Sequence, residues 1–141
     1  MDASSPTPDP LPDQPPARRT APAPLVVAAS LVAVEAVMLV VYGVLEIVAV
    51  SGSRVVMGVT TSAFFVAYGV ALLLCVRGLL RLRSWARAPI VLAQLIQVLV
   101  GWSFRGGGTT PVAVAMIAVG LLVLAGLFHP ASVRALAPGS G

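Results

Sequence analysis

The stretch LVVAASLVAVEAVMLVVYGVLEIVAV, Leu25 to Val50, decides the fold. It is apolar except for Ser30, Tyr42 and two glutamates, Glu35 and Glu46. As an α-helix it would be about 39 Å long, which is enough to cross a bilayer core of about 30 Å with some tilt. Glu35 then lies near the middle of the bilayer, where a carboxylate is costly unless it is protonated or paired. We therefore expect the polar face of this helix to turn toward other helices.

The composition of the whole chain also indicates a membrane protein. Of its 141 residues 58% are hydrophobic and only 10% are charged, whereas soluble domains contain about 25% charged residues. The formal net charge of +4 comes from nine basic residues, all of them arginine. These arginines lie at the ends of apolar segments, which is typical of charges that set membrane topology and not of a nucleic-acid surface.

Four apolar segments are each long enough to span a bilayer. We expect them at residues 25–50, 55–76, 85–104 and 112–128. The sequence therefore predicts an all-α polytopic membrane protein, a bundle of four transmembrane helices. Residues 1–24 hold eight prolines and three aspartates, so we expect a disordered cytoplasmic tail there. Residues 130–141 are expected to form a second, short cytoplasmic tail.

The arginines also predict the orientation of the helices. With both ends of the chain in the cytoplasm, only Arg54 and Arg105 lie outside. The cytoplasmic side then holds Arg18, Arg19, Arg77, Arg81, Arg83, Arg87 and Arg134. Because short cytoplasmic loops are rich in Lys and Arg, we expect a multi-pass protein of the inner (cytoplasmic) membrane with both termini in the cytoplasm.

Glu35 has two candidate partners on the third segment. Gln94 lies nine residues after Trp85, and this places it at nearly the depth of Glu35. Gln97 follows three residues later on an adjacent part of the same face. Such a cluster is either a proton or cation site or a set of interhelical hydrogen bonds, each worth about 0.6 kcal/mol on average. We favour the structural interpretation.

Near the outer ends of the helices, Glu46 shares the helical stripe of Glu35. We expect it to form an ion pair with Arg54 or Arg105. Elsewhere the chain has a single cysteine, Cys75, and a single histidine, His129. No nucleophile–base pair, phosphate-binding glycine loop or metal-ligand spacing is recognisable. We therefore expect no enzymatic activity, no catalytic residue, no metal and no cofactor.

A weak internal echo links the two halves of the chain. Residues 53–69 align with residues 104–120 at an offset of 51, and Glu35 falls opposite Gln94 at an offset of 59. This pattern favours two helical hairpins that are parallel repeats, since each enters the membrane from the same side. Apolar sequence rich in Ala, Val and Leu also produces such matches by chance, so a repeat is one of two interpretations.

The stretch RSWARAP at residues 83–89, with Gln94, Gln97, Trp102 and Pro130, is similar to uncharacterised small four-helix integral membrane proteins of actinobacteria. The resemblance covers the third and fourth segments and implies the same four-helix fold. It carries over no site residues, because that family has no assigned activity. The chain also resembles small multidrug transporters of four helices in size and in the glutamate of its first segment. Those proteins are shorter, lack the Pro-rich tail, and carry later aromatic and glycine motifs that are missing here.

These observations predict a non-catalytic membrane component that acts through association with itself or with another membrane protein. Its expected partners are the lipid bilayer and either a second copy or another membrane protein, but not nucleic acid. The alternative is a small proton-coupled transporter that uses Glu35. A transporter requires a hydrated path to Glu35, whereas in an accessory component Gln94 or Gln97 would seal it.

Overall fold

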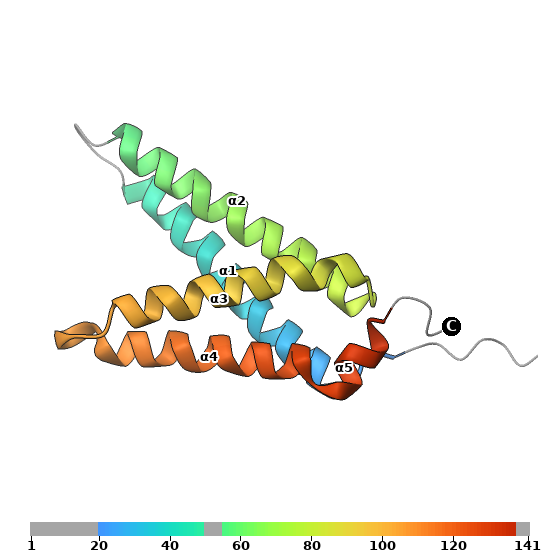
Figure 1. Cartoon of the computed structure of the whole chain (residues 1–141). Helices are drawn as coiled ribbons and strands as arrows, with labels where there is room; N and C mark the ends of the chain where they lie inside the picture. The colour runs from blue at the N-terminus through green and yellow to red at the C-terminus, as the bar shows by residue number, and fades with distance from the viewer. Residues whose placement is uncertain (1–19, 50–54, 138–141) are drawn as a thin grey trace, which may run out of the picture.

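The computed structural model describes residues 20–49 and 55–137. Four long helices make up most of this part of the chain (Figure 1). They are α1 (Ala23–Ala49), α2 (Val55–Leu80), α3 (Arg87–Ser103) and α4 (Thr110–Phe128). Shorter elements are the 3-10 helices η2 (Ser84–Ala86) and η3 (Gly107–Thr109) and the helix α5 (Pro130–Ala135). The predicted all-α bundle of four apolar helices is confirmed, and each long helix, α3 together with η2, is long and apolar enough to cross a membrane.

The helix ends differ from the predicted spans by a few residues in all four helices, and two differences from the prediction have a clear structural cause. α2 continues past Val76 to Leu80, because Leu79 belongs to the core and is fully buried. The predicted tail after residue 129 begins with the short helix α5. Its first turn is stabilised by Pro130 at the start of the helix and by His129, whose Nδ1 accepts a hydrogen bond from the N–H of Ala131 at 3.2 Å. Most of the predicted N-terminal tail, and Arg54, lie outside the described residues.

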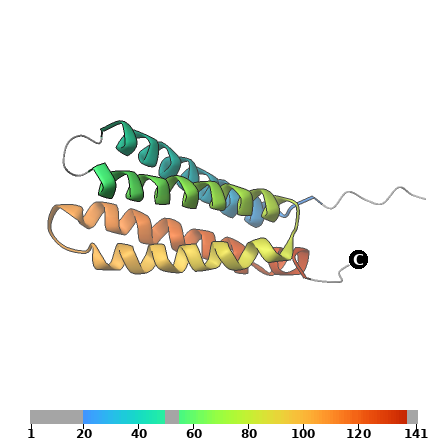
Figure 2. The same ribbon diagram turned by 90° about the horizontal axis from the view of Figure 1, so that it is seen from above.

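The long helices pack as two hairpins, α1 with α2 and α3 with α4 (Figures 1 and 2). We call the end of the bundle with the described chain ends, Thr20 and Ala137, the termini end, and the opposite end the hairpin end. The hairpins meet at the termini end, where a Cβ on Gly126 of α4 would lie 2.8 Å from the carbonyl oxygen of Pro24 in the first turn of α1. From there they diverge toward the hairpin end (Figure 1).

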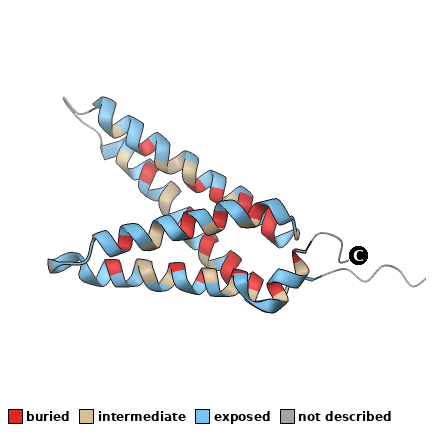
Figure 3. Ribbon diagram, viewed as in Figure 1, coloured by how far each residue is buried: buried red, intermediate tan, exposed pale blue. Residues whose placement is uncertain are grey.

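The apolar core lies in the half of the bundle near the termini end (Figure 3). All four long helices contribute fully buried side chains to it, namely Leu25, Val32, Leu79, Ile90, Val123 and Leu127. In the other half, the buried residues lie inside one hairpin at a time. Gly43 and Ser62 are buried between α1 and α2, and Gly101 and Ala113 between α3 and α4. The two hairpins therefore share a core over only about half of their length.

Both hairpins are built on the same contacts. A Cβ on Gly43 would lie 2.9 Å from the carbonyl oxygen of Ser62, and a Cβ on Gly101 would lie 3.2 Å from that of Ala113. Each buried residue of α4 also lies 51 positions after a buried residue of α2. The pairs are Ser62 and Ala113, Gly69 and Gly120, Leu72 and Val123, and Val76 and Leu127. The offset of 51 that the sequence indicated therefore describes a structural repeat.

The first helices of the two hairpins, α1 and α3, align with each other at a different sequence offset from the one expected. Gly69 faces the carbonyl oxygen of Ala36, and Gly120 faces the carbonyl oxygen of Gln94. Ala36 and Gln94 are 58 residues apart, so the expected alignment of Glu35 with Gln94 at an offset of 59 is wrong. The sequence could not resolve one residue in a run of small apolar side chains, whereas the backbone contacts of the glycines do.

Candidate functional site

The structure brings Glu35, Gln94 and Gln97 together in one hydrogen-bonded group, which we call the Glu35 cluster. Nε2 of Gln94 donates a hydrogen bond to Oε2 of Glu35 at 2.8 Å. Nε2 of Gln97 donates one to Oε1 of the same carboxyl at 2.5 Å. Both oxygens of the Glu35 carboxyl on α1 therefore accept a hydrogen bond from a glutamine amide on α3. The similar depth that helical rise predicts for these three residues is what allows them to meet.

The cluster also reaches the fourth helix. Nε2 of Gln97 donates a second hydrogen bond to the carbonyl oxygen of Met116 on α4, at 3.2 Å. Gln94 is buried, and its Oε1 has no hydrogen-bond partner. That oxygen lies 3.4 Å from the position that a Cβ on Gly120 would take, so it packs directly on the backbone of α4. Glu35 itself is only half-buried.

The cluster lies where the shared core ends. One turn toward the termini end from it, Val32 on α1 and Ile90 on α3 are fully buried. One turn toward the hairpin end, Leu39 on α1 and Val98 on α3 are only half-buried. The cluster therefore links the two hairpins by hydrogen bonds at the level where their shared apolar core ends.

An aromatic group that sequence reasoning did not identify lies next to the cluster, on the first hairpin. Tyr68 of α2 is half-buried and packs against the core. Its ring stacks on Phe64 with the ring centres 5.8 Å apart. Farther toward the hairpin end, Tyr42 of α1 meets Phe65 edge to face at 5.4 Å. The signal in the sequence that could have identified this group is the presence of three aromatic residues close together, at positions 64, 65 and 68, in one apolar segment.

The expected ion pair near the hairpin end does not form between Glu46 and Arg105. The guanidinium of Arg105 lies 3.0 Å from the centre of the Trp102 ring, and its Nε donates a hydrogen bond to the carbonyl oxygen of Trp102 at 3.0 Å. The divergence of the hairpins separates α1 from the turn after α3, so Arg105 is satisfied locally. The other expected partner, Arg54, lies outside the described residues.

An apolar groove of about 180 Å³ separates α2 from α3. Its walls include Tyr68 and Cys75 on α2 and Pro89 on α3. The structural repeat explains why α2 and α3 stand apart here. Cys75 is the counterpart of Gly126, and the Cys75 side chain occupies space that Gly126 leaves free where α4 approaches α1. None of the groove's lining residues belongs to the Glu35 cluster.

The chemistry available to the cluster is limited. In the part of the chain that the structure describes, no group of three His, Cys, Asp or Glu side chains is placed to hold a metal ion. What the cluster offers is a single carboxyl, held by two amides, beside a tyrosine. Comparisons with known protein families, with curated proteins and with solved structures found no match. The similarity of residues 83–89 to the actinobacterial membrane proteins stays a prediction.

Proposed function

We propose that this chain is a non-catalytic component of the cytoplasmic membrane that acts by associating, inside the bilayer, with a second copy of itself or with another membrane protein. The observation that carries the proposal is the confinement of the shared core to one half of the bundle. Helices associate in membranes through close packing and interhelical hydrogen bonds. The hairpin-end halves of the two hairpins do not pack on each other, so their facing sides remain free to pack against a further helix.

The hydrogen bonding of Glu35 supports a structural role for the cluster. Each oxygen of its carboxyl already accepts an amide N–H, so the costly polar group at mid-membrane depth is used to join the hairpins. Leu39 and Tyr42 continue the stripe of Glu35 toward the hairpin end, since residues four and seven apart lie on one face of a helix. Tyr42 is 53% exposed. In an assembly, this stripe on α1 is the face that contacts the partner helix.

The orientation that we propose places both chain ends in the cytoplasm. The termini end carries the arginines Arg77, Arg81, Arg83, Arg87 and Arg134, whereas the described part of the hairpin end carries Arg105. This asymmetry supports a cytoplasmic location for the termini end.

Photo-crosslinking from the proposed contact face tests the association. A benzophenone amino acid replaces Tyr42 in one sample and Val114 in a matched control. Val114 is 58% exposed and also lies in the hairpin-end half of the bundle, but on α4. After irradiation of native membranes, the Tyr42 position should give a protein adduct whose mass identifies a second copy or another protein. The Val114 position should give lipid adducts. Lipid adducts alone from both positions, together with a single-chain mass in nanodiscs, would contradict the proposal.

The second candidate is a small proton-coupled transporter. The observation that favours it is the half-buried state of Glu35 at the point where the hairpins diverge. A transporter in liposomes would move protons or a cationic dye along a pH gradient, and Glu35→Gln would abolish that movement while leaving the fold intact. Wild-type protein without flux would exclude this candidate.

A further inference from the structure

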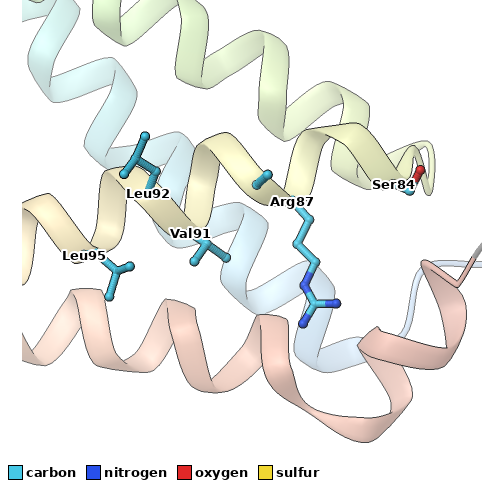
Figure 4. A pocket seen from close by; sticks show the side chains of 6 residues that line it. Ser84, Arg87, Val91, Leu92 and Leu95 are labelled. Atoms are coloured by element: carbon cyan, nitrogen blue, oxygen red, sulfur yellow. The ribbon is translucent and has the colours of Figure 1, made fainter.

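A groove of about 380 Å³ follows the surface of α3 from η2 toward the middle of the bundle (Figure 4). Its lining residues are Ser84, Arg87, Ala88, Val91, Leu92 and Leu95. The polar ones, Ser84 and Arg87, lie at the termini end of the groove, and the rest of the wall is apolar. The groove therefore has a polar mouth and an apolar body.

The mouth of the groove lies in a region of unbalanced positive charge. Arg77, Arg81 and Arg83 are exposed at the same end of the bundle, in the last turn of α2 and the connection that leads to η2. Among residues 20–49 and 55–137, the acidic side chains are Glu35 and Glu46, and neither lies at the termini end. An anion at the mouth would thus meet the guanidinium of Arg87 and no described carboxylate, at an end of the bundle that carries an excess of positive charge.

Arg87 is held in position at this mouth. Its guanidinium lies 4.7 Å from the centre of the Phe128 ring at the end of α4, an arrangement in which the ring attracts the cation. Figure 4 shows the side chain leaving α3 toward α4. Trp85, one residue after Ser84, is 57% exposed. Exposed Trp is typical of the membrane–water interface, so Arg87 and Ser84 lie at the depth of lipid headgroups.

We propose that this groove binds an anionic phospholipid from the leaflet on the termini side. The phosphate accepts charge-assisted hydrogen bonds from the guanidinium of Arg87. One acyl chain lies along Val91, Leu92 and Leu95. From Arg87 to Leu95 the helix rises about 12 Å, most of the roughly 15 Å that one leaflet contributes to the hydrocarbon core.

Charge and shape together select this occupant. A zwitterionic lipid would place a choline cation beside the arginines, and an inorganic phosphate would leave the apolar wall unused. Basic sites at the cytoplasmic ends of transmembrane helices commonly bind anionic headgroups. The inference goes beyond the proposed function and does not depend on it, because the lipid site lies on α3 near the termini end and the proposed contact face on α1 near the hairpin end.

Native mass spectrometry of the full chain in mild detergent tests the site. Phosphatidylglycerol and phosphatidylcholine with identical acyl chains are added in parallel titrations. Wild-type protein should retain phosphatidylglycerol preferentially, and Arg87→Gln should weaken its retention about fivefold. Arg105→Gln, at the hairpin end, is the matched control and should change nothing. Ala88→Phe should reduce retention of both lipids by filling the groove.

Two further measurements test what holds the lipid in the groove. Phe128→Leu removes the ring under the guanidinium but keeps the charge, so it should weaken the preference less than Arg87→Gln does. Inorganic phosphate at millimolar concentration should not displace the lipid. Equal retention of the two lipids, an unchanged preference in Arg87→Gln, or full displacement by phosphate would each overturn the proposal. Unchanged melting temperatures of the variants in detergent show that a loss of lipid is not a loss of fold.

Discussion

Gly69 on α2 and Gly120 on α4 stand at the same point of the two hairpins, and each faces the backbone of the preceding helix. A Cβ on Gly69 would lie 2.7 Å from the carbonyl oxygen of Ala36, and a Cβ on Gly120 would lie 3.4 Å from that of Gln94. The repeat thus aligns a buried alanine with a buried glutamine. The polar side chain is present in only one of the two hairpins, and it reaches across to a glutamate of the other.

Gly69→Ala should destabilise the bundle by about 1–3 kcal/mol, because the added methyl group would overlap a backbone oxygen that cannot rotate away. Gly120→Ala should cost less, since its closest contact, at 2.8 Å, is a methyl group of Val98 that can shift. Gly108→Ala is the control, with no atom within 4 Å of the added Cβ. Unfolding in detergent followed by circular dichroism measures all three. Equal costs at Gly69 and Gly108 would show that the close approach is not essential.

Ser62→Ala should leave the free energy of unfolding unchanged or raise it by up to about 1 kcal/mol, because a buried hydroxyl without a partner is unfavourable. Ser62 is fully buried, its Oγ has no hydrogen-bond partner, and its counterpart in the repeat is already an alanine, Ala113. Ser132→Ala provides the contrast. That hydroxyl donates to the carbonyl oxygen of Gly126 at 2.7 Å, so its removal should cost about 0.5–1.5 kcal/mol. A large loss in Ser62→Ala would mean that this hydroxyl has a partner in the membrane.

Much of this architecture could be predicted from hydropathy and helical rise alone. The apolar runs predict the four helices, and equal depth predicts that Glu35 can meet Gln94. Depth says nothing about the lateral separation of helices, so the divergence of the hairpins, which keeps Glu46 from Arg105, could not be predicted. The groove on α3 was not predicted either, because it depends on where the ring of Phe128 holds the guanidinium of Arg87.

The orientation is tested by cysteine accessibility on a Cys75→Ala background. Gly108→Cys, in the turn at the hairpin end, should react with a membrane-impermeant maleimide from outside intact cells. Ser84→Cys, at the termini end, should react only after the membrane is opened, because the arginines around it favour the cytoplasm. Both positions are exposed, so a difference in labelling reports sidedness and not burial. Labelling of Ser84→Cys from outside would reverse the proposed topology.

Glu35→Gln and Glu35→Leu together distinguish a structural role of the cluster from a role in which Glu35 binds and releases a proton. Glu35→Gln keeps a group that can accept a hydrogen bond and should change the free energy of unfolding by less than about 1 kcal/mol. Glu35→Leu leaves the amides of Gln94 and Gln97 without their acceptor and should cost about 1–2 kcal/mol. Unfolding of the purified variants in detergent measures these changes.

A double-mutant cycle then isolates the interaction between the two hairpins. If the cost of Glu35→Leu comes from the stranded Gln94 amide, adding Gln94→Leu should recover part of it, because removing both partners of a buried hydrogen bond can be nearly neutral. Additive losses in the double variant would place the contribution of Glu35 in contacts other than the one with Gln94, such as its hydrogen bond with Gln97. If the cluster couples in this way and the protein shows no proton flux in liposomes, the role of Glu35 is structural. Its carboxyl then joins the two hairpins at the level where their shared apolar core ends.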